Sequence, residues 1–199
     1  MEKSWIEKLS EYAESKGYEY WSHKSMSSGG FVRNVITSTK YFMMEIKNES
    51  YTYYYCASAD HSGSISTNGS FSGVFRVFSD RKLADLKIRR RFWIDRIFSA
   101  NRQKTGIPTI DKKLFLQCSD KELATHIANS RLGHSFLKIS KRVTPLEIIV
   151  EPNRMKFNSN FKKKSIMGIR SNRWVTDVKE LNQLIDSGIN ILNSIPNKR

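Results

Sequence analysis

The chain has 199 residues and a hydrophobic content of 39%, including four Trp, eight Tyr and eleven Phe. This is enough large apolar surface for one ordinary domain to fold without metals or disulfides, and it excludes an intrinsically disordered chain. The net charge of +15 is unevenly spread, because residues 1–80 carry eight Lys or Arg against nine Asp or Glu, whereas residues 81–199 carry 26 against ten. The basic half is therefore expected to face a negatively charged partner.

The two cysteines, Cys56 and Cys118, fit neither a disulfide framework nor a metal cluster. They indicate buried free thiols in a reducing compartment, with one bridge between them as the alternative. The N-terminus lacks the apolar segment of a signal peptide, and no apolar stretch approaches the length of a membrane-spanning helix. We expect a cytoplasmic protein without a transmembrane segment, folded as one domain over residues 1–199.

The first predicted element is a helix over residues 5–16, because its apolar residues recur at helical spacing. Ser4 and Glu7 form a capping box at its start, and Gly17 is placed to end it. Short segments rich in aromatic and β-branched residues then predict antiparallel strands. Asn68-Gly69 favours a hairpin turn before the last of them, with a long surface loop as the alternative. The predicted strands cover residues 18–21, 31–37, 41–47, 51–57 and 71–78.

The second half predicts a similar succession of strands and helices. Ser119 and Glu122 form a second capping box, Gly133 is placed to break the helix that follows, and Pro152 with Asn153 predicts a hairpin turn. The predicted elements are a strand over 84–91, a helical turn over 92–98, a strand over 110–118, a helix from 119 towards 132, strands over 146–150 and 155–158, and a helix over 177–193. Together the elements predict an α+β fold, a mainly antiparallel sheet with helices packed on one face.

A set of short motifs runs through the second half: Leu86-Lys87-Ile88-Arg89-Arg90-Arg91, Thr105-Gly106, Ile110-Asp111, Ser119-Asp120 and the helix at Leu123. This succession resembles a loose family of uncharacterised bacterial proteins. In that family a strand leads to a Thr-Gly turn, an Asp-containing strand, a helix, a hairpin and a C-terminal helix. Ile107 stands here where the family pattern has Asp. The resemblance implies a shared fold of unknown function and supplies no catalytic residues.

One triplet is typical of an enzyme. Glu45-Ile46-Lys47 lies on a predicted strand, and Glu11 and Glu14 lie on the preceding helix. A metal-dependent nuclease needs carboxylates for its metal and a Lys near the attacking water. The same spacing of acid and Lys recurs elsewhere in this Lys-rich chain, so an ordinary solvent-facing strand is the alternative. The four histidines lack a second ligand at metal spacing, and no phosphate-binding loop is present. The sequence therefore predicts no catalytic residue, metal or cofactor.

The basic residues are concentrated in two segments, 81–113 and 152–175, and the second contains no acidic residue. Arg guanidinium groups can bridge phosphate oxygens and Lys supplies mobile point charges, as contacts to a nucleic-acid backbone require. Nearby aromatic residues could stack on bases, although the spacing of Phe92, Trp93 and Trp174 favours the core. The cations that we expect to contact a polyanion are Arg89, Arg90, Arg91, Lys162, Lys163, Lys164, Arg170 and Arg173.

The sequence thus favours a non-enzymatic binding module whose basic surface meets a polyanion, above all nucleic acid. Two alternatives stay open. One is a protein-interaction or scaffold subunit that docks an acidic partner or an anionic membrane surface, and the other is the metal-dependent nuclease. The first hypothesis requires the two basic segments to be neighbours in space.

Overall fold

The computed structural model describes residues 3–28, 36–49, 51–61, 69–78, 86–96, 103–120, 122, 125, 131–152 and 164–195. Its strands are β1 (Tyr20–Ser28), β2 (Ile36–Lys47), β3 (Thr52–His61), β4 (Gly69–Phe78), β5 (Lys87–Arg90), β6 (Leu114–Gln117), β7 (Glu147–Pro152) and β8 (Ser165–Ser171). Its helices are α1 (Trp5–Lys16), η2 (Trp93–Arg96), α2 (Pro108–Asp111), α4 (Arg131–Ile139) and α5 (Val178–Asn193), where η2 is a short 3₁₀ helix.

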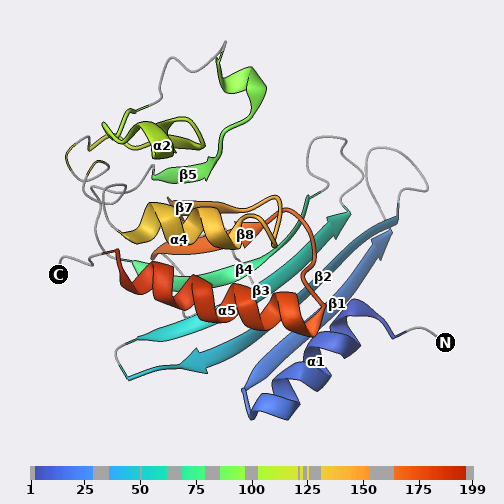
Figure 1. Ribbon diagram of the computed structural model, residues 1–199. Coiled ribbons are helices and arrows are strands. Elements are labelled where there is room, and N and C mark those ends of the chain that lie inside the picture. The colour runs from blue at the N-terminus through green and yellow to red at the C-terminus, as the bar shows by residue number, and fades with distance from the viewer. Residues whose placement is uncertain are drawn as a thin grey trace.

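The strands form one antiparallel sheet in the order β1-β2-β3-β4-β8-β7-β5-β6 (Figure 1). Each of the first four strands pairs with the next along the chain, whereas β8 from the C-terminal half pairs with β4. One sheet therefore contains strands from both the neutral and the basic half.

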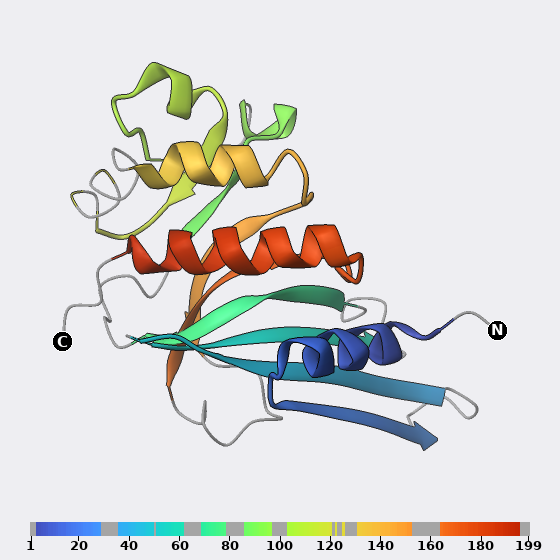
Figure 2. The ribbon, with the colours of Figure 1, turned by 60° about the horizontal axis from the view of Figure 1, so that its bottom comes forward.

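Helices α1, α4 and α5 lie over the same face of the sheet (Figure 2). Their buried side chains, such as Leu9, Phe136 and Leu184, share one core with sheet residues such as Phe42 and Ile148. The second face carries a smaller buried cluster that includes Phe75 and Cys56. The predicted α+β fold with helices on one face is confirmed.

Side chains cap the starts of the two long helices, at the predicted capping box in α1 and at Asp177 in α5. The Ser4 side chain accepts a hydrogen bond from the Glu7 amide, and the Glu7 carboxylate accepts one from the Ser4 amide at 2.7 Å. Gly17 ends α1 at a φ of 68°, a conformation that glycine adopts without steric cost. The Asp177 carboxylate accepts hydrogen bonds from the amides of Lys179 and Glu180, both at 3.0 Å, and caps α5.

The N-terminal strands are longer than predicted. β1 begins at Tyr20 and continues to Ser28, and β2 runs without a break from Ile36 to Lys47, where two separate strands were expected. Ser, Thr and Lys lie within these strands because pairing with neighbouring strands satisfies their backbone groups whatever the side chain. The first part of the predicted strand over 31–37, and Asn68 of the expected turn, lie outside the described residues.

Three predictions for the second half are wrong. The strand predicted over 110–118 begins only at Leu114, as β6. Residues 108–111 form α2, because Pro108 favours the first turn and the Asp111 carboxylate accepts hydrogen bonds from the preceding loop, including the Thr105 amide at 2.9 Å. Gly133 lies buried inside α4 and does not break it. Pro152 pairs with Ser165 in the sheet and is not part of a turn. The predicted strand over 155–158 lies outside the described residues.

Two buried residues connect β4 to the C-terminal half. Arg76 is 1% exposed, and its Nη2 donates to the carbonyl oxygens of Leu192 and Ile195 at 3.0 and 2.8 Å, at the end of α5. Phe75 lies against Gly168 of β8, where a Cβ would come within 2.1 Å of the ring. Both cysteines are buried thiols that form no disulfide, as predicted, and burial raises the pKa of the Cys56 thiol, which keeps it protonated.

Candidate anion-binding pocket

The sheet brings the two basic segments together. β5 and β8 both pair antiparallel with β7, which lies between them. They therefore run in the same direction, and their C-terminal ends lie at the same end of the strands of the sheet. In this register Arg89 lies opposite Glu147, which lies opposite Arg170 on the other side. Paired residues point to the same face of a sheet, so these three charged side chains form a row across the strands.

A pocket of about 320 Å³ lies where β5 and β8 end. Four arginines from the ends of β5 and β8 contribute to it, together with the segment that leads into β7. Its lining residues are Arg89, Arg90, Arg91, Phe92, Thr144, Pro145, Leu146, Glu147, Arg170 and Asn172.

An ion pair holds Arg89 in the wall of this pocket. Its two terminal nitrogens donate to the two carboxylate oxygens of Asp95, each at 2.6 Å, and its guanidinium lies 4.2 Å from the centre of the Phe115 ring. Hydrogen bonds from Arg89 hold the pKa of the Asp95 carboxyl below its usual value, so that it stays ionised at neutral pH. Such a bidentate pair restricts both side chains to one geometry.

Glu147 is the acid at the centre of the row. Its carboxylate accepts a hydrogen bond from Arg170 Nε at 2.7 Å and lies 3.3 Å from Lys87 Nζ. Burial favours the neutral carboxyl and is the largest single effect on its pKa. Hydrogen bonds and charge from Arg170 and Lys87 together outweigh burial and hold the pKa below its usual value. The carboxylate is therefore charged at neutral pH and fixes the position of Arg170.

The remaining two arginines give the pocket its excess of positive charge. Arg90 is exposed, and Arg91 is partly buried with its Nε unpaired in the described part of the chain. Among the described residues, Glu147 and Asp95 form ion pairs with two of the four arginines, which leaves a surplus of two positive charges before Lys87 is counted. This combination of a concave surface and surplus cations suits an anionic ligand.

Aromatic and apolar side chains are exposed beside the arginines. Phe92 is 53% exposed, Trp93 73% and Ile94 46%. The prediction that Phe92 and Trp93 belong to the core is wrong, because η2 turns Asp95 inward to Arg89 and its neighbours outward. Trp174 is partly buried and stacks on Trp5 with ring centres 4.9 Å apart, at the margin of the core and not within it.

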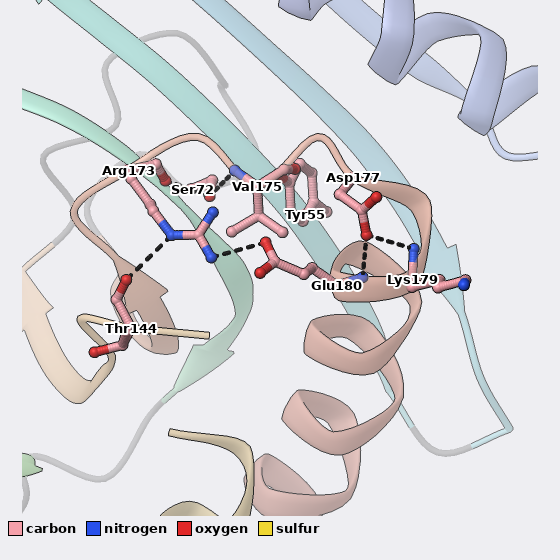
Figure 3. A network of polar contacts seen from close by, with 8 residues as sticks. All are labelled: Tyr55, Ser72, Thr144, Arg173, Val175, Asp177, Lys179 and Glu180. Atoms are coloured by element: carbon pink, nitrogen blue, oxygen red, sulfur yellow. Dashed lines mark hydrogen bonds and ion pairs between the residues drawn. The ribbon is translucent and has the colours of Figure 1, made fainter. Parts of the chain in front are cut away.

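A polar network fixes the wall that leads into β7 (Figure 3). The Arg173 guanidinium donates to the Thr144 carbonyl at 3.1 Å and to the Glu180 carboxylate at 2.7 Å. Ser72 of β4 donates to the Arg173 carbonyl and accepts from the Val175 amide. These bonds connect the segment between β8 and α5 to β4. Arg173 therefore stabilises the pocket through its hydrogen bond to Thr144 and does not line it.

The eight predicted cations do not form one patch. Arg89, Arg90, Arg91 and Arg170 line the pocket, and Arg173 adjoins it through Thr144. Lys164 is exposed at the opposite end of β8, about 20 Å away along the strand at about 3.3 Å per residue. Lys162 and Lys163 lie outside the described residues.

Sequence reasoning missed the acids and the neutral wall of the pocket. The spacing of Asp95 after Arg89 could have indicated a pair across a tight turn. Glu147 carries no comparable signal, because it lies far along the chain and reaches the arginines only through strand pairing.

The structure does not bring Glu45 together with Glu11 and Glu14, the carboxylates of the alternative nuclease hypothesis. β2 presents Met44 and Ile46 to the core beneath α1, so the alternate residue Glu45 points to the other face of the sheet, away from Glu11 and Glu14. The described residues contain no group of three His, Cys, Asp or Glu side chains that could hold a metal ion.

Within the described residues, the helices are too short or too polar to cross a membrane. Comparison with known protein families, with curated proteins and with solved structures finds no match to this chain.

Proposed function

We propose that this protein is a non-enzymatic binding module, and that its arginine pocket receives phosphate groups of a nucleic acid. The observation that supports this most strongly is the convergence of Arg89, Arg90, Arg91 and Arg170 on one pocket from two segments remote in sequence. Arginine forks match phosphate oxygens, and two of these four are held in place by acids before any ligand arrives.

The exposed aromatic residues favour nucleic acid over other polyanions. Phe92 lines the pocket and Trp93 follows it, both more than half exposed. Aromatic side chains next to a basic groove stack on unpaired bases, which contributes about 1–3 kcal/mol per base. An inorganic or carboxylate polyanion has no base that could stack on these rings.

The proposal is tested by fluorescence anisotropy with labelled single-stranded DNA and RNA over a series of salt concentrations. We expect a dissociation constant that rises with salt, because binding releases counterions from the phosphates. Arg90→Glu should weaken binding at least about tenfold. Lys164→Glu is the matched control, since it makes the same charge change at an exposed position remote from the pocket.

Two results would contradict the proposal. One is a dissociation constant in the millimolar range or weaker at low salt. The other is an equal loss of affinity in Arg90→Glu and Lys164→Glu, which would assign binding to net charge and not to the pocket.

A second candidate is docking of an acidic protein. Exposed Trp93 and Phe92 beside arginines have the composition typical of protein interfaces, where Trp and Arg contribute most of the binding energy. Polyglutamate would then compete with a labelled oligonucleotide at equal charge concentration. Under the nucleic-acid proposal polyglutamate competes much more weakly than an unlabelled oligonucleotide.

A further inference from the structure

In the described part of the chain, four arginines at the ends of β5 and β8 converge on one pocket. Its volume of about 320 Å³ is at the lower end of the range for small-ligand sites. A continuous nucleic-acid backbone needs cations repeated along a track. Here Lys164 lies at the far end of β8, and Arg173 is committed to Thr144 and Glu180. A group of cations around one pocket is suited to a single phosphate at the end of a nucleic-acid strand.

We propose that the pocket binds the terminal phosphate monoester of a single nucleic-acid strand, with the terminal base against Phe92 and Trp93. This inference rests on the proposed function and specifies which part of the nucleic acid the pocket holds.

The charge of the pocket favours a monoester over a phosphodiester. The lining arginines exceed Glu147 and Asp95 by two positive charges, and Lys87 adds a third nearby. A phosphate monoester carries a charge of about −1.5 to −2 at pH 7 and three terminal oxygens, whereas each internal phosphodiester carries a single charge. The monoester therefore neutralises the surplus more completely.

The donors of the pocket also fit a group with several acceptor oxygens. Arg91 Nε is buried without an acceptor in the described part of the chain, a costly state for a charged donor. Arg90 contributes a guanidinium from an exposed position. Arg91 lines the same pocket, so its guanidinium can donate to a phosphate oxygen bound there.

The aromatic residues indicate an unpaired end. Phe92 packs 5.2 Å from the Arg89 guanidinium and is 53% exposed, so the ring joins the phosphate-binding arginines to the adjacent Trp93. In a blunt duplex end the terminal base is paired and stacked. In a single strand its face is free for an aromatic side chain.

The test compares four fluorescent oligonucleotides of one sequence, with the full-length protein and at one salt concentration. They carry a 5′ phosphate, a 3′ phosphate, hydroxyls at both ends, or a 5′ phosphate in a blunt duplex. We expect one of the single strands with a terminal phosphate to bind about tenfold or more tightly than the strand with two hydroxyl ends. The 5′ and 3′ arms identify which end is recognised.

Two exposed substitutions assign the effect to its parts. Arg90→Ala should remove most of the advantage of the phosphorylated strand, whereas Trp93→Ala should weaken binding of all three single strands and leave the advantage. Lys164→Ala is the control, and it should retain both the affinity for single strands and the advantage of the phosphorylated strand. Circular dichroism of each variant checks that the fold is unchanged.

The outcomes separate this inference from the proposed function. Equal binding of all single strands, with loss in Arg90→Glu, would overturn the terminal-phosphate inference and leave the proposed function intact. Absence of binding by every oligonucleotide would overturn both. Tighter binding of the blunt duplex than of the phosphorylated single strand would also overturn the inference.

Discussion

Glu147 is a buried acid among cations that otherwise favour an anionic ligand. Its carboxylate contacts Arg170 and Lys87 across neighbouring strands. Without it the two cations would repel each other in a partly buried place. The acid therefore stabilises the fold while lowering the affinity of the pocket for anions, and the two effects can be measured separately.

Glu147→Gln should destabilise the protein by about 1–3 kcal/mol, because the acceptor loses its negative charge while Arg170 and Lys87 keep their positive charges. The same substitution should tighten binding of an oligonucleotide, since it removes a negative charge and so raises the net charge of the pocket by one. Urea unfolding and anisotropy measure the two effects at pH 7. Weaker binding by a folded variant would contradict this account of the pocket.

The contribution of Glu147 to stability should depend on pH. Its pKa in the folded protein lies below its usual value of 4.5. The contribution is therefore fully present above about pH 4.5 and is lost as the pH falls through the lower pKa of the folded state. The difference in unfolding free energy between wild type and Glu147→Gln should shrink in that acidic range. A difference that stays constant from pH 7 to pH 3 would disprove the ion pair.

At the residue scale the sequence identified cations but not their partners. The density of arginines in two segments predicted Arg89 and Arg170 as contacts. Their roles differ from those of Arg90 and Arg91, because acids already hold them. Only the three-dimensional register tells a committed arginine from one available to a ligand.

At the scale of elements, the pairing of β4 with β8 depends on a glycine. Gly168 lies directly opposite Phe75, and the ring occupies the space that a side chain would need. The aromatic ring thereby covers both strands where the two halves of the chain meet.

Gly168→Ala should destabilise the protein by about 1–3 kcal/mol, because its Cβ would fall 2.1 Å from the Phe75 ring. Phe75→Leu alone should also destabilise it. The double variant should lose less stability than the sum of the two, since the smaller side chain relieves the clash. Thermal or urea unfolding of all four proteins completes the cycle, and additive losses would show that the two residues do not interact.

Elements with local signals were predicted well and the others were not. α1 follows from its capping box and helical spacing and α5 from helical spacing, and both are confirmed. α2 was missed, because the fold of its loop depends on the Asp111 carboxylate, a local contact that periodicity does not reveal. Strand ends were misplaced wherever partner strands extend pairing into polar sequence, as in β1.

At the scale of the molecule, the neutral and basic halves are parts of one structure. β4 pairs with β8, Arg76 of β4 binds the end of α5, and the Tyr12 hydroxyl of α1 donates to Asn182 of α5 at 2.7 Å. The strand order that produces these contacts could not be predicted from sequence, because pairing between distant segments has no local pattern. The charge asymmetry was evident, but not its arrangement.

Fragments 1–80 and 81–199 should each fail to fold alone. Separation would expose the edges of β4 and β8 and leave Arg76 without its carbonyl partners, so aggregation is expected. Expression of each fragment, followed by size-exclusion chromatography and circular dichroism, tests this. A monomeric fragment 81–199 with cooperative unfolding would show that the basic half is an independent unit.

The strand order also gives the molecule an electric dipole. The near-neutral meander β1–β4 fills one side of the sheet, and the arginine pocket lies towards the other. In the field of a polyanion such a molecule experiences a torque and turns its β5 side forward before any contact forms. At physiological ionic strength screening limits this effect to about 8 Å, so orientation acts only in the last steps of approach and association should accelerate as salt is removed.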